Sequence, residues 1–532
     1  MIRIFSVLLL TVSFGLAQKK YIHDVITFIP NQPPLADSAY KLAQSIDTNR
    51  LKEVLNYLAS DSCQGRELGT PGNDRASTFI SSKLSSFGIS FPPGKESYFQ
   101  RVDFRWISWE YNEINIGDYD YRQIWDYVSI PTENESLSFQ SDSIIFLGYG
   151  IESPTYSDYS SLSLKGKTIV IYNGEPHDKN GINYLTGSSH ASVFASRENK
   201  LRAASRHGVA CVMIVEEKFR ELADQNRSTL YSPVVQIANK VAVNPNPVNT
   251  VFISSTMFSK IIGPLQKKII TARDKINKTH KPKFVVIKTP VRIKMMKQVQ
   301  EVKGNNILAY FEGTDKKDEV LIISAHYDHI GMRGQDVFNG ADDNASGSSA
   351  VTEIARILSF AAANGMKTRR SVVCMLMTGE EKGLLGSMYY VNDPVFPLDK
   401  TIADINIDMI GRTDQKYEGN KSYIYVIGSD RLSKDLHKAN EDITRLYSHL
   451  TMDYTYNAED DPNRYYYRSD HYNFAEKGIP AIFFFSGVHE DYHRITDDPE
   501  KIIYDKYLKV VQHAFLLAWR LANQEQRPAL DK

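Results

Sequence analysis

The chain is poor in cysteine, has no excess of either charge and, beyond its first residues, has no long hydrophobic run. Only Cys63, Cys211 and Cys374 occur among 532 residues, an odd and sparse set that does not form a disulfide framework. Lys plus Arg and Asp plus Glu both total 63, so no basic excess is present to collect nucleic-acid phosphates. We therefore expect no nucleic-acid partner.

Signatures of several enzyme classes are also missing. The sequence contains no GxSxG serine-hydrolase elbow, no GxGxxG dinucleotide loop and no P-loop. These absences exclude the classes of enzyme that depend on those motifs.

The first residues have the pattern of a secretory signal. Arg3 precedes an apolar stretch of thirteen residues, 4–16, and the small residue Ala17 follows. Such a stretch is too short to cross a hydrocarbon core of about 30 Å comfortably. We expect residues 1–17 to be a signal peptide and the mature protein to be exported, to the periplasm or the extracellular space, without a stable membrane span.

The spacing of apolar residues changes along the remaining sequence. Apolar residues at helical spacing occur between Leu51 and Phe87, and short β-like runs begin at about Ser143. From Asn306 onward, apolar runs alternate with helical patterns, which is typical of a mostly parallel sheet covered by helices on both faces. We therefore expect an α/β fold: 18–142 as the first part of the main domain, 143–258 as a small β-rich insert, 259–305 as a return strand and linker, and 306–532 as the core.

Metal-capable side chains stand at the ends of four predicted strands. VLIISAH ends at His326, SVVCMLMTGEE at Glu380 and Glu381, INIDMI carries Asp408, and AIFFFSGVHEDYH leads to His493. A pair of acids, Asp342 and Asp343, lies in the loop after the first of these strands. Because ligands bind outside the carboxyl ends of parallel strands, we expect these groups to converge. Imidazoles combined with carboxylates favour zinc or a similar divalent ion.

Six motifs that contain these residues resemble metallopeptidase family 28, the co-catalytic zinc aminopeptidases. HYDHIG, NGADDNASG, MTGEEKGLLGS, INIDMIG, RSDHYNFAEKGIPAIFF and HEDYHRITDD occur in this order between about Asn306 and Ala522. Upstream, YLASDSCQGRELGTPGNDRA resembles the family's amino-terminal segment, and 143–258 resembles a protease-associated domain. The resemblance implies a zinc-exopeptidase-like fold and an enzyme that removes residues from the free N-terminus of peptides or proteins.

The resemblance also implies a role for each site residue. Asp342 would bridge two zinc ions, with His326 and Asp408 completing one site and Glu381 and His493 completing the other. Glu380 would remain uncoordinated as the general base that accepts a proton from water and returns it to the leaving amine. Supporting roles would fall to Asp328, which would orient His326, to Tyr466 near the developing oxyanion, and to Asp343, Ser469 and Asp470 around the ligands. The peptide bond after Asp342 would be cis.

Three alternatives use the same residues. His489, Glu490 and His493 satisfy HExxH, a single-zinc protease signature that needs a helix, although Gly487 and Pro499 disfavour one there. A one-zinc enzyme resembling glutaminyl cyclases is a second alternative, and a non-catalytic binding protein on a peptidase scaffold is a third. The complete set of acidic and histidine positions favours a hydrolase.

Overall fold

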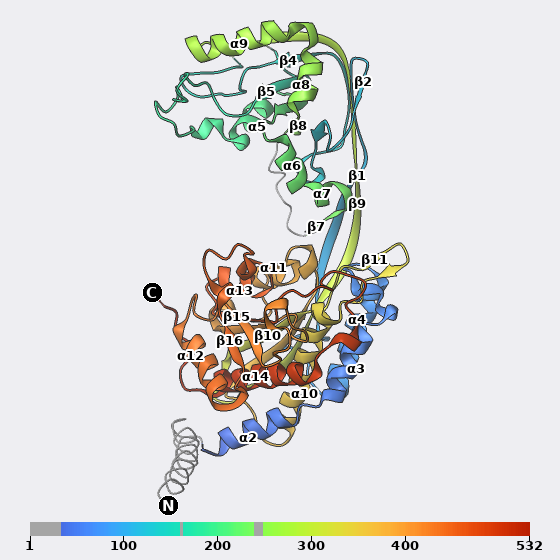
Figure 1. The fold of residues 1–532 in the computed structure, drawn as a ribbon, viewed down its shortest axis with the longest axis vertical. Helices are drawn as coiled ribbons and strands as arrows, with labels where there is room; N and C mark the ends of the chain where they lie inside the picture. Colours follow the sequence, from blue (N-terminus) through green and yellow to red (C-terminus); the bar gives the residue numbers. More distant parts are fainter. Residues whose placement is uncertain (1–32, 160–162, 239–247, 532) are drawn as a thin grey trace, which may run out of the picture. The chain divides into compact units, whose positions relative to one another are not determined.

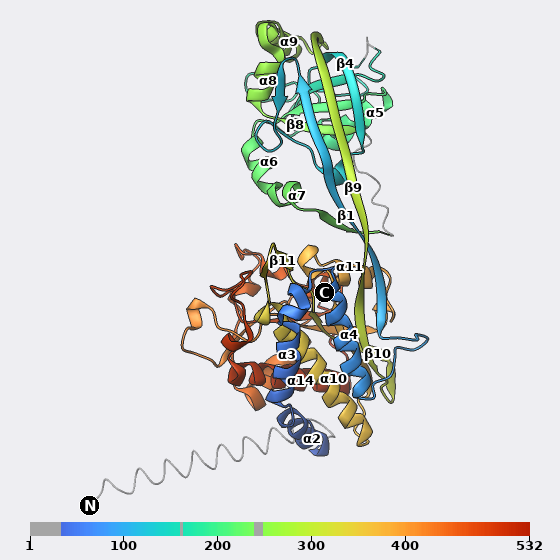
Figure 2. The ribbon, with the colours of Figure 1, turned by 90° about the vertical axis from the view of Figure 1, so that its right-hand side faces the viewer.

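The computed structural model describes residues 33–159, 163–238 and 248–531, which form two compact units (Figures 1 and 2). Of these residues, those up to Val102 and those from Lys303 onward form one unit, and those between Asp103 and Val302 form the other. The expected signal peptide, 1–17, lies outside the described residues. The first unit therefore combines two segments of sequence that are separated by an insert.

The limits of this insert differ from the expected 143–258. Both limits lie inside long continuous strands: the first lies in β1 (Phe99–Ile116) and the second in β9 (Val285–Phe311). A change in composition marks where packing changes, whereas these boundaries lie within strands whose hydrogen bonding continues. For that reason, the composition and hydrophobic pattern of the sequence do not reveal where the insert begins and ends.

A mixed, mostly parallel sheet forms the centre of the first unit. Its strand order is β16-β15-β17-β14-β10-β13-β9, in which β13, β10, β14 and β17 are parallel. β9 runs antiparallel to β13, and β15 runs antiparallel to β17 but parallel to β16. The strands are β10 (Lys316–His326), β13 (Arg370–Met377), β14 (Thr401–Ile407), β15 (Tyr423–Ile427), β16 (Thr451–Asp453) and β17 (Ala481–Phe485). The predicted α/β class, with helices flanking a mostly parallel sheet, is confirmed.

Helices cover both faces of this sheet (Figure 1). They are α2 (Pro33–Gln44), α3 (Thr48–Leu58), α4 (Pro71–Ser86), α10 (Gly347–Ala363), α11 (Leu385–Asn392), α12 (Lys434–Ile443), α13 (His471–Glu476) and α14 (Tyr504–Asn523). Alternate residues of β10 face opposite sides: Ile323 joins a core with α3, α10 and α14, whereas Ile322 joins one with α11 and α13. The strands are buried on both sides, which explains their continuous apolar sequences.

In the inserted unit the strand order is β9-β4-β5-β6-β8-β3, with β4, β5, β6 and β8 parallel, and the long strand β9 is common to both units. Its other strands are β2 (Tyr119–Tyr121), β3 (Tyr127–Val128), β4 (Leu137–Phe146), β5 (Thr168–Tyr172), β6 (Cys211–Val215), β7 (Val234–Ile237) and β8 (Asn249–Ile253). Its helices are α5 (Arg197–Arg206), α6 (Phe219–Gln225), α7 (Arg227–Tyr231), α8 (Ser255–Ile262) and α9 (Gln266–Thr279). Its relation to protease-associated domains stays a prediction.

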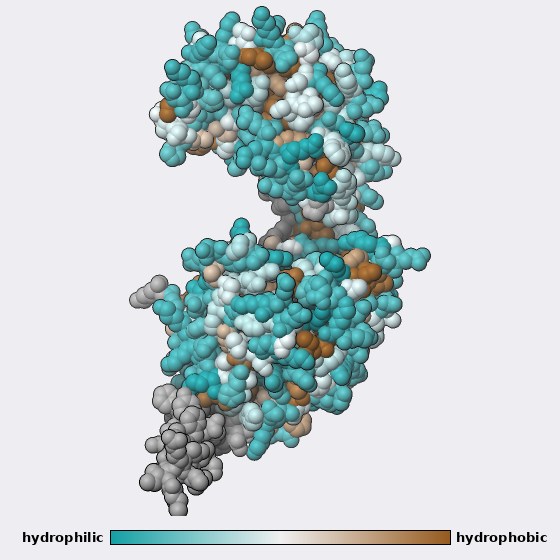
Figure 3. Space-filling view, in the orientation of Figure 1, coloured by the Kyte–Doolittle hydropathy of each residue, from teal (hydrophilic) through white to brown (hydrophobic). Residues whose placement is uncertain are grey.

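The three cysteines are all buried and free. Within the described ranges, no helix combines the length and apolar character needed to cross a membrane. Hydrophilic side chains cover most of the surface visible in Figure 3, where hydrophobic ones form small separate patches. The three thiols are therefore buried in the interior and are not paired in disulfides.

The core of the first unit generates a stability prediction for α14. Phe515 is fully buried against the sheet, so we expect Phe515→Ala to lower the free energy of unfolding by about 3–5 kcal/mol, through lost apolar burial and the cavity left behind. Phe360 on α10 is 50% exposed, and Phe360→Ala should change it by less than about 0.5 kcal/mol. Denaturant titration of both variants checks the difference, and equal effects would contradict the described packing.

Candidate metal and catalytic site

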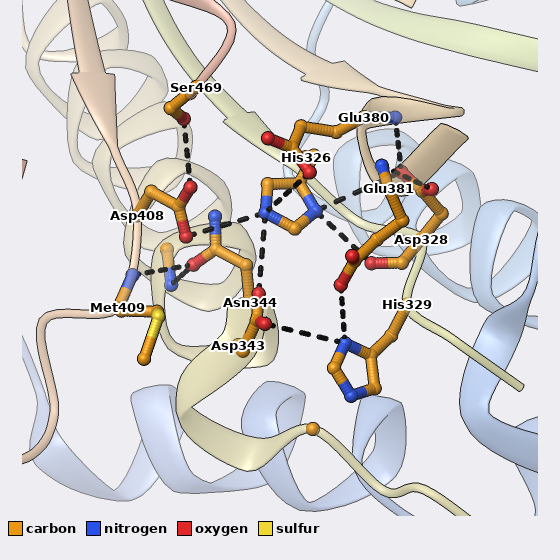
Figure 4. Close-up of polar contacts among 12 residues, drawn as sticks. His326, Asp328, His329, Asp343, Asn344, Glu380, Glu381, Asp408, Met409 and Ser469 are labelled. Carbon is orange, nitrogen blue, oxygen red and sulfur yellow. Dashed lines mark hydrogen bonds and ion pairs between the residues drawn. The ribbon is translucent and has the colours of Figure 1, made fainter. Parts of the chain in front are cut away.

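Histidine and acidic side chains converge at the carboxyl ends of β10, β13, β14 and β17 (Figure 4). They form two groups, which we call group A and group B. Group A consists of His326, Glu380 and Asp408, and group B of His329, Asp343, Glu381 and His493. In each group, one donor atom from every residue lies within 4.8 Å of the others.

Group A joins the last residue of β10 to the residue that follows β14. His326 Nε2 lies 3.3 Å from Asp408 Oδ1 and 3.9 Å from Glu380 Oε2. Burial alone would lower the pKa of His326, but the negative charges of Asp408 and Glu380 outweigh it and raise that pKa well above its usual value. The imidazole therefore lies in a strongly negative environment.

Group B joins the turn after β13 to the turn after β17. His493 Nε2 lies 3.3 Å from Glu381 Oε2 and 3.0 Å from Asp343 Oδ2. Burial by itself would lower the pKa of His493, yet the nearby carboxylates of Asp343 and Glu381 raise it to about 10. Burial by itself would raise the pKa of Glu381, but the hydrogen bond with His329 and the facing imidazole of His493 hold it well below its usual value.

Asp343 lies between the two groups. Its Oδ1 is 3.6 Å from His326 Nε2 and its Oδ2 is 3.0 Å from His493 Nε2. The motif predicts Asp342 at this position, but in the structure the residue between the two groups is Asp343. Asp342 faces away: its Oδ1 accepts the backbone N–H of Gly411 at 2.6 Å and its Oδ2 lies 3.4 Å from His489 Nε2.

The loop backbone decides which of the two acids faces the site. The residues from Ala341 to Ser346 form an irregular π-helical turn, with non-helical angles at Asp343 and Asn344. The cis peptide bond lies between Asp343 and Asn344 rather than after Asp342. Two consecutive aspartates are equivalent in a sequence pattern, so only the path of this turn distinguishes them.

Glu380 and Glu381 are placed by Asp328. The Asp328 carboxylate accepts the backbone N–H of Glu380 at 3.1 Å and that of Glu381 at 3.4 Å. His326 Nδ1 faces the backbone oxygen of Asp328 at 3.1 Å, while the nearest carboxylate oxygen is 3.8 Å away. Asp328 therefore acts on His326 through its main chain, and its side chain fixes the turn that carries both glutamates.

Two further expected residues lie behind group A. Ser469 Oγ donates to Asp408 Oδ2 at 2.8 Å, which leaves Asp408 Oδ1 facing His326. Ser469 Oγ in turn accepts the side-chain N–H of Asn406 at 2.8 Å. Asp470 is buried and accepts a hydrogen bond from Ser387, and burial raises its pKa to about 6. Ser469 thus contacts a group A carboxylate directly, whereas Asp470 is held by Ser387.

A pocket with an empty volume of about 370 Å³ opens beside the carboxylates. It is lined by Asp343, Glu380, Glu381, Asp408, Met409, Tyr465, Arg468, Phe483, Phe485, Val488 and Tyr492. Tyr466 is not part of this lining: its ring lies under the Arg431 guanidinium, 4.8 Å from the ring centre, and beside Gly428. The phenols that line the pocket are Tyr465 and Tyr492.

The HExxH segment does not form a helix, since His489 is in irregular backbone and 490–493 is a turn. His489 faces Asp342, whereas His493 faces Asp343 and Glu381. The Glu490 side chain is 80% exposed and lies 3.3 Å from Arg412. This geometry does not support a single-zinc HExxH site.

Two residues outside the predicted site, Arg66 and Asp497, hold the Asp343 loop. Arg66 is completely buried, and its guanidinium donates to the backbone oxygens of Gly340 at 2.8 Å and Asp343 at 3.1 Å. Asp497 Oδ2 accepts the backbone N–H groups of Asp342 at 3.0 Å and Asp343 at 3.2 Å. The only signal for Arg66 was its place in the amino-terminal segment that resembles the family.

The donor atoms fit a pair of divalent cations. His326 Nε2, Asp408 Oδ1 and His493 Nε2 are buried and have no hydrogen-bond partner among the described residues, a costly state that a cation would relieve. With bonds of about 2.0–2.1 Å, the donors of a tetrahedral zinc ion stand about 3.3 Å apart. The separations of 3.0–3.6 Å that link Asp343 to its two histidines, and those histidines to Asp408 and Glu381, agree with that spacing.

Two adjoining groups of nitrogen and oxygen donors, with Asp343 between them at the strand ends of an α/β sheet, form an arrangement typical of co-catalytic metal hydrolases. Residues 306–518 match the model of peptidase family M28, which confirms for this part of the chain the resemblance predicted from the six motifs.

Two curated relatives and one solved structure show how far the similarity extends. Leupeptin-inactivating enzyme 1 of Streptomyces exfoliatus is 31% identical over 199 residues, 37% of this chain and 39% of that protein. Aminopeptidase YwaD of Bacillus subtilis is 25% identical over 224 residues, 41% of this chain and 44% of that protein. The matched region thus covers less than half the length of each of these relatives. An aminopeptidase from Aneurinibacillus sp. strain AM-1 shares the fold, with a TM-score of 0.53 at 17% identity over 92% of this chain and 97% of its own.

The position of Asp343 generates a prediction about metal content. We expect Asp343→Asn to remove most of the bound zinc, because both groups lose their common anionic donor. Asp342→Asn should retain it, since Asp342 faces Gly411 and His489 instead. Metal analysis of both proteins after dialysis, with thermal unfolding to confirm folding, decides between them. Loss of zinc in the Asp342 variant alone would restore the register expected from the sequence.

Proposed function

We propose that this protein is an exported aminopeptidase that uses two zinc ions to hydrolyse the first peptide bond of peptides with a free N-terminus. The observation that carries the proposal is the Asp343 carboxylate, which lies between the two histidine-containing groups with Glu380 beside them. The names of the two curated relatives, a leupeptin-inactivating enzyme and an aminopeptidase, support it.

The candidate donor residues would form two metal sites that share Asp343. His326, Asp408 and Asp343 would hold one ion, and Glu381, His493 and Asp343 the other. Zinc bound there would supply Lewis-acid polarisation and a water of lowered pKa. The donor set of imidazoles and carboxylates is the one that zinc accepts in catalytic sites.

Glu380 is the residue suited to move the proton. It lines the pocket, and burial raises its pKa well above the usual value, so the carboxyl group holds a proton readily once it has accepted one. The backbone hydrogen bond to Asp328 fixes its main chain. Glu380 would take the proton of the attacking water and deliver it to the leaving amine.

The pocket also suggests which substrates fit. Met409, Phe483, Phe485 and Val488 form an apolar wall in the same pocket as the carboxylates. A peptide with its first carbonyl at the donor groups would place its first side chain against this wall. Apolar N-terminal side chains gain most from such burial, about 25 cal/mol per Å² of apolar surface.

We expect Glu380→Gln to lower kcat by about 10²–10⁴-fold, the usual contribution of a general base, while the zinc content stays near that of the unaltered protein. Hydrolysis of a leucyl or phenylalanyl amide with a free amine, measured together with metal analysis, checks both parts.

Glu490→Gln is the matched control because the Glu490 side chain is exposed, does not line the pocket and lies 3.3 Å from Arg412. It should keep full activity, and inactivation by this change instead would favour the HExxH alternative. An amine-blocked version of the same substrate should not be cleaved. Cyclisation of N-terminal glutamine without hydrolysis would support the glutaminyl-cyclase alternative, and zinc binding without turnover would support the binding protein.

The apolar wall generates a separate prediction. Val488 is only partly buried and lines the pocket, so Val488→Trp should fill space beside the carboxylates. We expect kcat/KM for leucyl and phenylalanyl substrates to fall at least about tenfold relative to that for an alanyl substrate, about 1.4 kcal/mol of lost discrimination. Equal losses for all three substrates would show that this wall does not contact the first side chain.

A further inference from the structure

His329 is a second histidine of the β10 loop and belongs to group B, yet it contacts Glu381 differently from His493. The His329 side chain is completely buried, and its Nδ1 lies 2.8 Å from Glu381 Oε1. His493 Nε2 instead lies 3.3 Å from the other oxygen, Oε2. The two imidazoles therefore take different oxygens of one carboxylate (Figure 4 shows the His329 contact).

The distances distinguish a hydrogen bond from a shared ion. Two donors of one tetrahedral zinc ion stand about 3.3 Å apart, as His493 Nε2 and Glu381 Oε2 do. The 2.8 Å between His329 Nδ1 and Glu381 Oε1 is shorter and is an ordinary length for an N–H···O bond. His329 Nδ1 is also 3.7 Å from Asp343 Oδ2, farther than His493 Nε2 at 3.0 Å.

The hydrogen-bond inventory of the ring gives the same answer. His329 Nε2 is buried and has no hydrogen-bond partner in the described part of the chain. A neutral ring with its proton on Nδ1 uses its one donor on Glu381. A ring bonded to metal through Nδ1 would carry its proton on Nε2, where that buried N–H would lack an acceptor.

The ring is held in place by the same loop that positions Asp343. The backbone N–H of His329 donates to the backbone oxygen of Arg66 at 3.3 Å. Gly340 packs directly on the ring: a Cβ at that position would lie 2.4 Å from His329 Cδ2, and the φ of +55° there also favours glycine. Arg66 donates in turn to the backbone oxygen of Gly340 at 2.8 Å. The ring therefore has little freedom to rotate.

We propose that His329 is a positioning residue: it donates Nδ1–H to Glu381 Oε1 and so holds Glu381 as a one-oxygen donor, with Oε2 directed to the ion shared with His493 and Asp343. This inference rests on the proposed function, because it needs a metal ion in group B. A ligand carboxylate fixed by a second hydrogen bond is a common device, and loss of such a partner typically weakens metal affinity 10–100-fold.

Three substitutions of His329 test the proposal. His329→Leu removes the donor; His329→Asn keeps an amide N–H near the place of Nδ1; His329→Gln moves that N–H about one bond farther along the side chain. We expect zinc at one of the two sites to bind 10–100-fold more weakly in the Leu and Gln variants and within about threefold of the unaltered protein in the Asn variant. Competition with a chelator at graded concentrations of free zinc measures the zinc dissociation constants of both sites.

Cobalt substitution gives a readout that a general loss of stability would not move. The visible absorption of bound Co²⁺ should change in the Leu and Gln variants and be restored in the Asn variant. If the Leu variant does not fold, the comparison of Asn with Gln carries the test, since both keep a polar side chain. His513→Leu is the matched control: His513 is equally buried but bonds Ser448 at 2.9 Å and Asn440 at 2.8 Å, and both zinc affinities should stay unchanged.

Two outcomes would overturn the proposal. Unchanged zinc affinity and cobalt absorption in the Leu variant would show that His329 does not act on Glu381. Equal loss of one zinc in the Asn, Gln and Leu variants would show that His329 is itself a ligand. Failure of the proposed function is a separate result, since the unaltered protein would then bind fewer than two zinc ions or leave free-amine substrates intact.

Discussion

The position of the Asp343 carboxylate is the constraint on which the site depends. Its two oxygens must face two histidines that come from different strand ends, so the backbone on either side of it has to be fixed. Arg66 donates hydrogen bonds to carbonyl oxygens of this loop, and Asp497 accepts hydrogen bonds from its N–H groups. Together they restrain both the acceptors and the donors of the same turn. Neither residue offers a donor to the cations, yet both determine where the shared donor lies.

The site gathers more buried negative charge than its own positive groups balance. Burial raises the pKa of Glu380, of Asp408 and of Asp328, the last to about 7, so these carboxyl groups resist ionisation without a nearby cation. Divalent ions bound there would supply that missing charge, and their binding energy would then contribute to the stability of the folded state. Metal binding would therefore be coupled to folding.

The α/β class and the location of the chemistry at strand ends follow from features that sequence displays directly. Continuous apolar runs followed by a histidine or an acid mark β10 and β14, and the structure has His326 as the last residue of one and Asp408 directly after the other. The shared carboxylate was placed one residue too early because a pair of identical aspartates carries no information about the direction of the turn. The sequence does not predict the role of Arg66, because its partner Asp343 lies 277 residues farther along the chain.

The contact between Arg66 and the metal loop also bears on how the chain assembles. During synthesis the arginine emerges long before Gly340 and Asp343, and the whole insert is made in between. Closing so long a loop is slow, as for any protein rich in contacts distant in sequence. The pairing of β1 with β9 joins the polypeptide before the insert to the polypeptide after it, so early folding of the insert would shorten the search. A fragment that begins at 306, where the family match starts, would contain every candidate zinc donor but not the arginine that fastens their loop.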